Sequence, residues 1–363
     1  MPDQLVTLRS PGADEPPAVA ERPAARPPRG RNPYRQLPAV RWAVQAAYAL
    51  FLTSVGWEFW RFYEQAAAGG PLTASRPPAV EAFLPISALV GLKRFVHTGQ
   101  WDDIHPAGLV ILLSAIGTAF AARKAFCSWV CPVGTLSRVL EWVGKKTLWR
   151  RGRQLVVPRW LDLPLLSLKY LLLAFFLWIV WVQMPLEAID GFMKAPFNLA
   201  ADAKMLLFFQ GLSATGGVVL GALVVLSVVV KHFWCRYLCP YGALLGLASL
   251  ASPQRVVRDA ATCNDCQACT RACPAQIPVH RRASVWTAEC TGCLSCVAAC
   301  TVPDCLTANR RAKKGMSPWL IPAAALAVML GAWAVARLTG HWQTSLPDEV
   351  LAEVYRIAPF LGH

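Results

Sequence analysis

Two closely spaced runs of cysteines constrain this chain more than any other feature of its sequence. Residues 263–274 read CNDCQACTRACP and residues 290–300 read CTGCLSCVAAC, so the spacing C-x2-C-x2-C-x3-C occurs twice in fewer than 40 residues. Three cysteines within seven residues can wrap one [4Fe–4S] cluster, while the fourth cysteine of the run reaches another cluster. Structural zinc sites typically use two cysteine pairs separated by a longer loop, so the pattern favours two iron–sulfur clusters.

These runs predict two ligand sets of four thiolates each. Because the fourth cysteine of each run crosses to the other cluster, we expect cluster 1 on Cys263, Cys266, Cys269 and Cys300, and cluster 2 on Cys273, Cys290, Cys293 and Cys296. Pro274 follows the first run, but Thr301 stands at the matching position after Cys300. A further thiol, Cys305, is either an alternative ligand or a packed thiol without a ligand role.

The rest of the chain is more apolar than a soluble fold. Of its 363 residues 55% are hydrophobic and 16% are charged, whereas a soluble domain carries about 25% charged residues. A bilayer span needs about 20 apolar residues as helix, and five stretches fit, near residues 41–60, 104–122, 161–183, 205–230 and 317–338. We therefore predict a membrane all-α helical bundle of about five spans, with a small α+β bicluster ferredoxin-like domain inserted before the last span.

The distribution of basic residues predicts the orientation of this bundle. With the N-terminus inside, the inner segments hold 26 Lys and Arg and the outer segments hold 8, as the positive-inside rule requires. We expect a multi-pass protein of the bacterial inner (plasma) membrane, with the N-terminus and ferredoxin-like domain cytoplasmic and the C-terminus periplasmic. The net charge of +15 is spread among apolar runs and forms no basic face interleaved with aromatics, so no nucleic acid partner is expected.

Four regions follow from these patterns. We expect residues 1–40 to be a disordered Pro/Arg-rich cytoplasmic tail, 41–254 a four-span membrane domain, 255–312 the ferredoxin-like domain, and 313–363 the fifth span with a short periplasmic tail. Thirteen cysteines, an odd number in tight groups, argue against a disulfide-rich secreted protein.

An eleven-residue pattern occurs twice within the membrane region. Residues 126–136 read FCSWVCPVGTL and residues 234–244 read WCRYLCPYGAL, each after a predicted span and with basic residues just upstream. The shared spacing C-x3-C-P-x-G-x-L predicts two structurally equivalent halves. Its four thiols, which we call the membrane cysteines, are Cys127, Cys131, Cys235 and Cys239.

Three interpretations of the membrane cysteines stay open. The two pairs face each other and hold one iron–sulfur centre, they act as redox-active dithiols, or they are buried thiols that only pack. In a regular helix, Cβ atoms four residues apart stand about 5–6 Å apart, whereas a disulfide needs about 3.5–4.5 Å. A disulfide within either pair therefore requires the helix to distort, and Pro132 and Pro240 favour such a distortion.

A membrane protein that oxidises quinol needs a base near the outer interface. The segment GQWDDIHPAG (99–108) places Asp103 and His105 immediately before the second predicted span, and Glu58 lies near the outer end of the first. These three residues are the candidates for a quinone site. Asp and Trp are also common at interfaces and helix starts, so a structural role is the competing interpretation.

The CxxxCP pair together with the double ferredoxin pattern resembles the NapH/NosR-like membrane polyferredoxins, over roughly residues 41–312. The resemblance implies a bundle whose ferredoxin segment faces the cytoplasm. It also implies electron transfer between the quinone pool and a partner redox protein or respiratory reductase, as in a quinol dehydrogenase subunit. Two other classes of function stay open: an assembly or metal-reduction factor for another respiratory enzyme, and a redox sensor.

Overall fold

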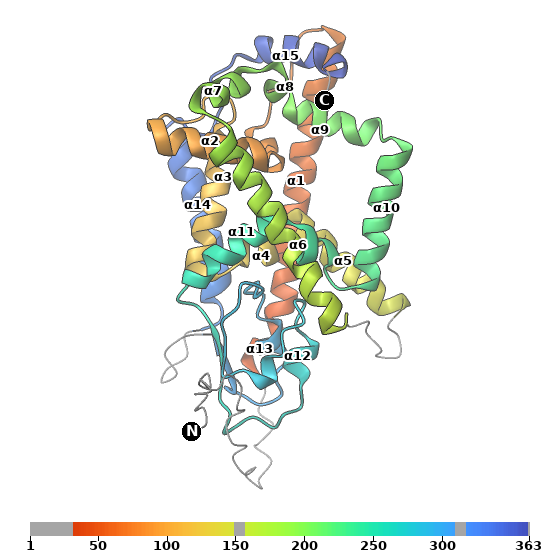
Figure 1. Cartoon of the computed structure of the whole chain (residues 1–363), viewed down its shortest axis with the longest axis vertical. Helices are drawn as coiled ribbons and strands as arrows, with labels where there is room; N and C mark the ends of the chain where they lie inside the picture. Colours follow the sequence, from red (N-terminus) through yellow and green to blue (C-terminus); the bar gives the residue numbers. More distant parts are fainter. Residues whose placement is uncertain (1–31, 149–156, 309–316, 362–363) are drawn as a thin grey trace, which may run out of the picture.

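The computed structural model describes residues 32–148, 157–308 and 317–361, and these residues are mostly helical. Long helices run along the molecule, and the short elements that include α12 (Ala268–Arg271) and α13 (Ser295–Ala299) lie at one end (Figure 1). The C-terminal helix α15 (Asp348–Ile357) lies at the opposite end, near α7 (Leu186–Lys194) and α8 (Pro196–Leu199). The ferredoxin-like and C-terminal regions therefore occupy opposite ends of the molecule.

The remaining helical elements of the bundle come in two groups. The first group contains η1 (Pro33–Gln36), α1 (Leu37–Ala68), η2 (Pro78–Phe83), α2 (Pro85–Thr98), α3 (Pro106–Ala122), α4 (Ala125–Trp129) and α5 (Pro132–Thr147). The second group contains α6 (Arg159–Trp178), η3 (Ile179–Gln183), α9 (Ala201–Gln210), α10 (Ala214–Val229), η4 (Trp234–Leu238), α11 (Pro240–Ala248) and η5 (Ser249–Ala251). After the inserted domain, α14 (Leu320–Leu338) returns along the bundle and packs against α3, and η7 (Ala358–Phe360) follows α15.

Two of the five predicted spans are helices long and apolar enough to cross a membrane. They are Trp160–Gln183, formed by α6 and η3, and Leu320–Leu338, which is α14. The predicted span near 205–230 is broken into α9 and α10, bent by 86°, and counts as a third span only if the two are taken together. The break has a local cause, because Ser213 caps α10 by accepting a hydrogen bond from the Gly216 amide.

The other two predicted spans do not meet the same test. α3 has 17 residues, fewer than the about 20 that a bilayer needs. α1 has 32 residues but contains Arg41, Glu58, Arg61 and Glu64, which lower its apolar character. Among the described residues, length and composition thus support two or three spans, where the sequence predicted about five.

The inserted domain contains a three-stranded antiparallel sheet and short helices. β1 (Val256–Arg258) lies between β2 (Ser284–Val285) and β3 (Leu306–Ala308). Val256 pairs with Val285 on one side and with Ala308 on the other, and all three side chains are buried. With α12, η6 (Val279–Arg281) and α13, this matches the predicted small α+β insert. The last predicted residues of this domain, 309–312, lie outside the described residues.

The predicted disordered tail, residues 1–40, is too long at its C-terminal end. Residues 1–31 lie outside the described residues, but residues from 32 onward are ordered against the inserted domain. The Asn32 amide donates hydrogen bonds to the carbonyl oxygens of Val297 and Cys300, at 2.8 and 3.1 Å. Its side-chain oxygen accepts from the Tyr34 amide at 2.8 Å and so caps η1. Asn32 therefore anchors the first described residues on the inserted domain.

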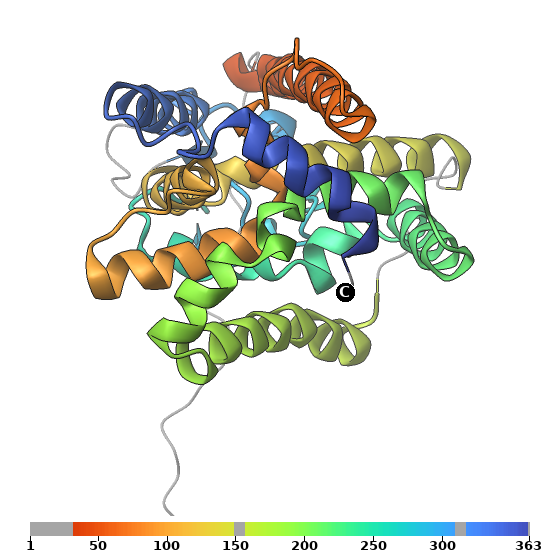
Figure 2. The same ribbon diagram turned by 90° about the horizontal axis from the view of Figure 1, so that it is seen from above.

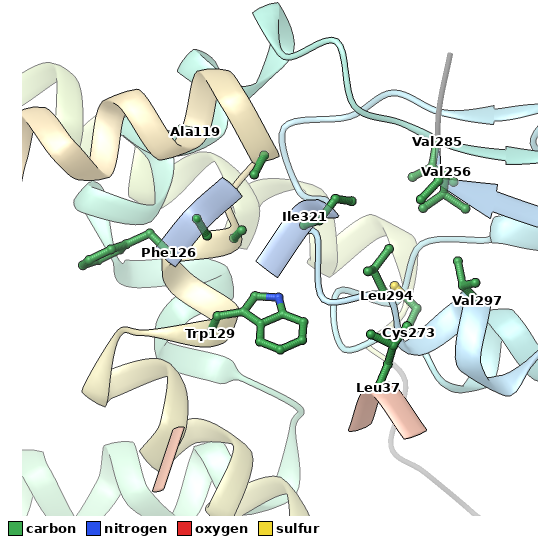
Figure 3. Packing of buried hydrophobic residues seen from close by; sticks show 14 of the residues in the cluster. Leu37, Ala119, Phe126, Trp129, Val256, Cys273, Val285, Leu294, Val297 and Ile321 are labelled. Atoms are coloured by element: carbon green, nitrogen blue, oxygen red, sulfur yellow. The ribbon is translucent and has the colours of Figure 1, made fainter. Parts of the chain in front are cut away.

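One hydrophobic core joins the inserted domain to the bundle. Figure 3 shows Trp129 and Phe126 of the bundle on one side, and Leu294 and Cys273 of the inserted domain on the other. The Trp129 indole is fully buried and donates a long hydrogen bond to the carbonyl oxygen of Gly292, at 3.4 Å. Because this core is shared, the inserted domain is held in a fixed position on the bundle.

The opposite end is covered by α15, which crosses the ends of the other helices in the view from above (Figure 2). Its Tyr355 ring is fully buried and meets the edges of Phe59 and Phe62 from α1, with ring centroids 6.0 and 5.7 Å away. Such edge-to-face pairs are favourable beyond the area that they bury. The C-terminal helix is therefore an integral part of the bundle.

Candidate functional site

Each CxxxCP segment leaves helical geometry at its second cysteine. Cys127 lies in the short helix α4 and Cys235 in a single π-helical turn, η4. Cys131 and Cys239 have extended backbones, with ψ of 125° and 105°, and each precedes the proline that starts the next helix. This is expected, because proline disfavours helix at the residue before it. The distortion predicted at the two prolines is therefore present.

The second cysteine of each segment stands at the N-cap position of the following helix. The Cys239 sulfur accepts a hydrogen bond from the Gly242 amide at 3.3 Å. The Cys131 sulfur stands at the equivalent position before α5 but makes no capping hydrogen bond. The amino end of a helix favours negative charge, so both sulfurs occupy positions that suit a thiolate.

The two halves pack reciprocally. The proline-led helix α5 of the first segment packs against α10, the helix that precedes the second segment. In return, α11 of the second segment packs against α3, the helix that precedes the first. The arrangement brings the membrane cysteines together: the Cys127 thiol is close enough to the other three for their charges to interact. All four are free thiols, and no disulfide is present among the described residues.

A cavity of about 70 Å³ lies beside these cysteines. It is lined by Cys127 and Cys235 from the two membrane segments and by Cys293 from the inserted domain. One water molecule needs about 10–15 Å³ measured in this way, so there is room for a larger group. The ionisable groups of its lining, other than cysteines, are mainly basic: Arg41, Lys124, Arg138, His232 and Arg236, against the single carboxylate of Glu289.

The two CxxxCP repeats, with the basic residues just before them, are called the first and second membrane segments (residues 123–136 and 231–244). The first membrane segment holds the CTGC loop of the inserted domain and the residues just before it. The Ser128 hydroxyl donates to the carbonyl oxygen of Thr291 at 2.8 Å, and Arg123 donates to that of Thr287 at 2.5 Å. From α1, Arg41 donates to the carbonyl oxygen of Cys293 at 3.0 Å. Thr291 and Cys293 lie within the cysteine run assigned to cluster 2.

The second membrane segment holds the loop around Cys273. Lys231 donates to the carbonyl oxygen of Arg271 at 3.1 Å, and the Arg236 guanidinium donates to that of Ala275. Two carboxylates support these contacts: Asp162 pairs with Arg236 at 2.8 Å, and Glu141 pairs with Lys231 at 3.9 Å. Cys273 is the predicted fourth ligand of cluster 2. Both membrane segments therefore make hydrogen bonds to the loops that carry the predicted cluster 2 cysteines.

Where ferredoxin cysteines lie close to one another, they belong to the same predicted set, while Cys266 is exposed and its sulfur lies 3.5 Å from the Thr301 hydroxyl. The Cys273 and Cys296 thiols lie close enough to those of Cys290 and Cys293 for their charges to interact. The Cys269 thiol likewise lies close enough to those of Cys263 and Cys300 for their charges to interact. No group of three or more His, Cys, Asp or Glu among the described residues is arranged to hold a single metal ion. A cubane takes one thiolate at each of its four iron corners, and the assignment of these eight cysteines to two such clusters stays a prediction.

Two thiols of the inserted domain, those of Cys293 and Cys300, have a lowered pKa. Burial raises the pKa of Cys293, but the Arg41 charge and hydrogen bonds from Ser295 outweigh it, so the net shift is downward. A hydrogen bond from the Cys305 thiol lowers the pKa of Cys300 to about 6. Cys305 is 2% exposed and also approaches the Asp259 carbonyl oxygen. Cys305 is therefore a hydrogen-bond partner of Cys300, a predicted cluster 1 ligand.

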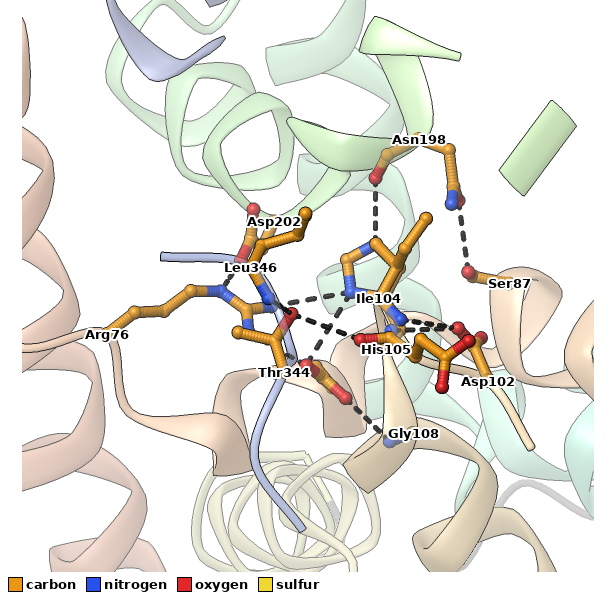
Figure 4. Close-up of polar contacts among 12 residues, drawn as sticks. Arg76, Ser87, Asp102, Ile104, His105, Gly108, Asn198, Asp202, Thr344 and Leu346 are labelled. Atoms are coloured by element: carbon orange, nitrogen blue, oxygen red, sulfur yellow. Dashed lines mark hydrogen bonds and ion pairs between the residues drawn. The ribbon is translucent and has the colours of Figure 1, made fainter. Parts of the chain in front are cut away.

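The three quinone-site candidates do not come together. Glu58 lies on the exposed face of α1, and the Asp103 carboxylate is 69% exposed, 3.8 Å from Arg94. Only His105 is buried, and its ring nitrogen Nε2 lies 2.8 Å from the Asn198 carbonyl oxygen. Figure 4 shows it within a polar network at the C-terminal end of the bundle.

That network is largely satisfied internally. The buried Arg76 guanidinium pairs with Glu81 at 2.8 Å and with Asp202 at 2.6 Å. Glu81 also accepts from the Gly108 amide at 2.9 Å, and Tyr355 donates to Asp202 at 2.6 Å. These bonds tie η2, α3, α9 and α15 together, so the network accounts for much of the polar chemistry that the sequence places at this end.

Sequence reasoning missed the residues that join the two parts. Arg41, Ser128 and Lys231 act through backbone carbonyl oxygens of the inserted domain, which carry no sequence pattern. Lys124 lines the cavity beside the membrane cysteines and is 4% exposed. The only signal for it was its position just upstream of the repeated pattern.

Comparisons with known proteins agree with this geometry. A family model described as a 4Fe-4S binding domain matches residues 104–151 and 212–256, and one described as a 4Fe-4S dicluster domain matches residues 255–301. The first model covers both membrane segments, and the second covers both ferredoxin runs.

Several curated relatives are similar over long stretches. YccM of Escherichia coli (strain K12), which is named for electron transport, is 40% identical over 342 residues, covering 92% of this chain and 94% of the relative. The ferredoxin-type protein NapH of Haemophilus influenzae is 29% identical over 54% of this chain and 67% of its own length. The regulatory protein NosR of Pseudomonas aeruginosa is 27% identical over 58% of this chain and 29% of its own length. No solved structure matches the chain.

The repeated C-P-x-G pattern generates a prediction about its two glycines. A Cβ atom at Gly134 would overlap the Cys127 carbonyl oxygen, whereas one at Gly242 would stand 3.6 Å from both the Cys235 carbonyl oxygen and the Cys239 sulfur. We therefore expect Gly134→Ala to lower the thermal stability and the iron content of the purified protein. The matched control, Gly242→Ala, keeps both near wild type. Equal effects of the two substitutions would contradict the geometry of the first segment.

Proposed function

This chain belongs to the NapH/NosR-like family of ferredoxin-type 4Fe-4S proteins, and we propose on that premise that it passes electrons between the membrane quinone pool and a partner redox protein. The observation that carries the proposal is the cavity shared by Cys127, Cys235 and Cys293. It makes the membrane cysteines direct neighbours of the loop that carries the cluster 2 ligands. Electrons can therefore pass from one group to the next without a moving domain.

Three sets of four thiolates would hold the redox groups. We assign cluster 1 to Cys263, Cys266, Cys269 and Cys300, and cluster 2 to Cys273, Cys290, Cys293 and Cys296. We assign a further iron–sulfur centre, the membrane centre, to Cys127, Cys131, Cys235 and Cys239. When bound, such clusters supply one-electron transfer at potentials set by their surroundings.

The donor chemistry fits a membrane centre. The four sulfurs converge from two equivalent segments, and two of them sit at helix amino ends that stabilise thiolates. The neighbouring cavity is lined mainly by basic side chains. Neither feature is needed by thiols that only pack, and a dithiol pair would not require four sulfurs in one place.

The contacts give the three groups an order. The membrane centre lies next to cluster 2, because both membrane segments hold the cluster 2 loops. Cluster 1 lies farther from the bundle, and its predicted ligand Cys266 is exposed. Exposure near a cluster is what an encounter with a second redox protein requires. We therefore place the exchange with the partner protein at the Cys266 end of the molecule.

The same arrangement supports the proposed membrane topology. The ferredoxin-like end and the C-terminal helix α15 lie at opposite ends of the bundle (Figure 1), and in the sequence the predicted inner segments hold 26 Lys and Arg against 8 in the outer ones. We propose that the ferredoxin-like end is cytoplasmic and that the C-terminus is periplasmic. Reporter fusions after residue 308 and after residue 363 should give cytoplasmic and periplasmic signals respectively. The same signal from both fusions would contradict this topology.

Removing a membrane cysteine should separate two routes of reduction. In anaerobically purified protein, a reduced quinol analogue should reduce clusters 1 and 2 in wild type but not in Cys127→Ala or Cys235→Ala. Dithionite should still reduce these clusters in both variants, because their eight ligands are intact. The double variant should be little worse than either single one, because residues that act as a unit are not additive.

The control is Cys305→Ala, which removes the one cysteine outside the three sets and should keep quinol-driven reduction. Electron transfer lost with unchanged iron content would favour redox-active dithiols in place of a membrane centre. Wild-type rates in all four single membrane-cysteine variants would show that these thiols only pack.

A further inference from the structure

Lys124 carries a buried positive charge beside the membrane cysteines. Its side chain is 4% exposed and lines the cavity together with Cys127 and Cys235. Its charge interacts with the sulfurs of Cys127, Cys235 and Cys239, which come from both halves of the repeat. Lys124 therefore faces the place where the two halves meet.

Within the described part of the chain, the Lys124 ammonium has no hydrogen-bond acceptor and no carboxylate at ion-pair distance. Its charge interacts with the Glu289 carboxylate, whose direct hydrogen bonds come from Lys169, at 2.6 and 2.7 Å, and from the Tyr170 hydroxyl at 3.0 Å. A buried ammonium that shares its one carboxylate with a second ammonium is only partly compensated. Lys124 is therefore a buried cation without a direct ion pair in the described part of the chain.

The other basic side chains that line the cavity each have a direct partner. Arg236 pairs with Asp162, and His232 with Glu141 at 3.1 Å. Arg138 lies over the Trp42 ring and donates to the Gln45 amide oxygen at 2.8 Å. Arg41 donates to a backbone carbonyl oxygen. Lys124 stands out because none of these kinds of partner is available to it.

The repeat makes this contrast sharper. Lys124 stands three residues before Cys127, and His232 stands three residues before Cys235. The residue at the second position contacts the Glu141 carboxylate, while the residue at the first makes no such contact. The cation without a direct ion pair therefore belongs to one half only, and its charge interacts with sulfurs of both halves.

We propose that Lys124 compensates the negative charge of the membrane centre and thereby raises its reduction potential. The inference rests on the proposed function, which places that centre on the membrane cysteines. A [4Fe–4S] core carries fewer positive charges than four thiolates carry negative ones, so the ligated group is an anion. Reduction adds one more negative charge, and a nearby cation favours that step, because cluster potentials depend on net charge and on local charges and dipoles.

The test is a redox titration of the anaerobically purified full-length protein, followed by electron paramagnetic resonance. Lys124→Met and Lys124→Gln remove the charge, and Lys124→Arg keeps it. The matched control is Lys146→Met, whose side chain is exposed on α5 and lies over the exposed Trp142 ring, 4.1 Å from its centroid. The expected result is a shift of the membrane centre to a lower potential in the Met and Gln variants alone. Clusters 1 and 2 should titrate as in wild type in all four.

The remaining outcomes separate this inference from the proposed function. A wild-type protein with only two clusters would overturn both. A membrane centre that is present in wild type and titrates unchanged in the Met and Gln variants would overturn the role of Lys124 alone. If the Met and Gln variants lose the iron of the membrane centre while the Arg variant keeps it, the charge is needed to hold the centre, which supports the proposal. Loss of that iron in the Arg variant as well would overturn it.

Discussion

The rest of the structure depends on the hydrogen bonds that the two membrane segments make to the cluster 2 loops. Ser128 and Arg123 hold one loop, and Lys231 and Arg236 hold the other, each through backbone carbonyl oxygens. Buried carbonyl oxygens need such partners. Because both halves of the repeat contribute, the inserted domain is fixed over the point where the membrane cysteines meet.

Charge explains why this junction contains so many basic residues. Four thiolates in a small space repel one another, and an apolar environment does not screen them. The basic lining of the cavity, with one carboxylate, offsets a negative occupant. The same residues serve two purposes, since Arg41 holds the Cys293 loop and also lowers the pKa of the Cys293 thiol. Position and electrostatics are thus set by one group of contacts.

Much of this arrangement could be predicted from spacing, because iron–sulfur ligation and proline chemistry act locally. The ferredoxin runs, the repeated CxxxCP segments and the break before Pro132 and Pro240 all follow from neighbours in sequence. The anchor at Asn32 and the exposed positions of Glu58 and Asp103 depend on tertiary contacts. The break between α9 and α10 has a local cause in the Ser213 cap, which the count of apolar residues does not detect. Lys124 is an intermediate case, since the repeat marks its position but only the structure shows that its charge is unpaired.

The most direct test of the account is the number and type of clusters in the full-length protein. Purified anaerobically, it should contain about twelve irons and twelve sulfides per chain, with Mössbauer spectra assigning all of the iron to [4Fe–4S] clusters. Replacing all four membrane cysteines with alanine should lower the count to about eight. A wild-type count of about eight, unchanged in that variant, would contradict a membrane centre and leave the two ferredoxin clusters as the only iron–sulfur groups.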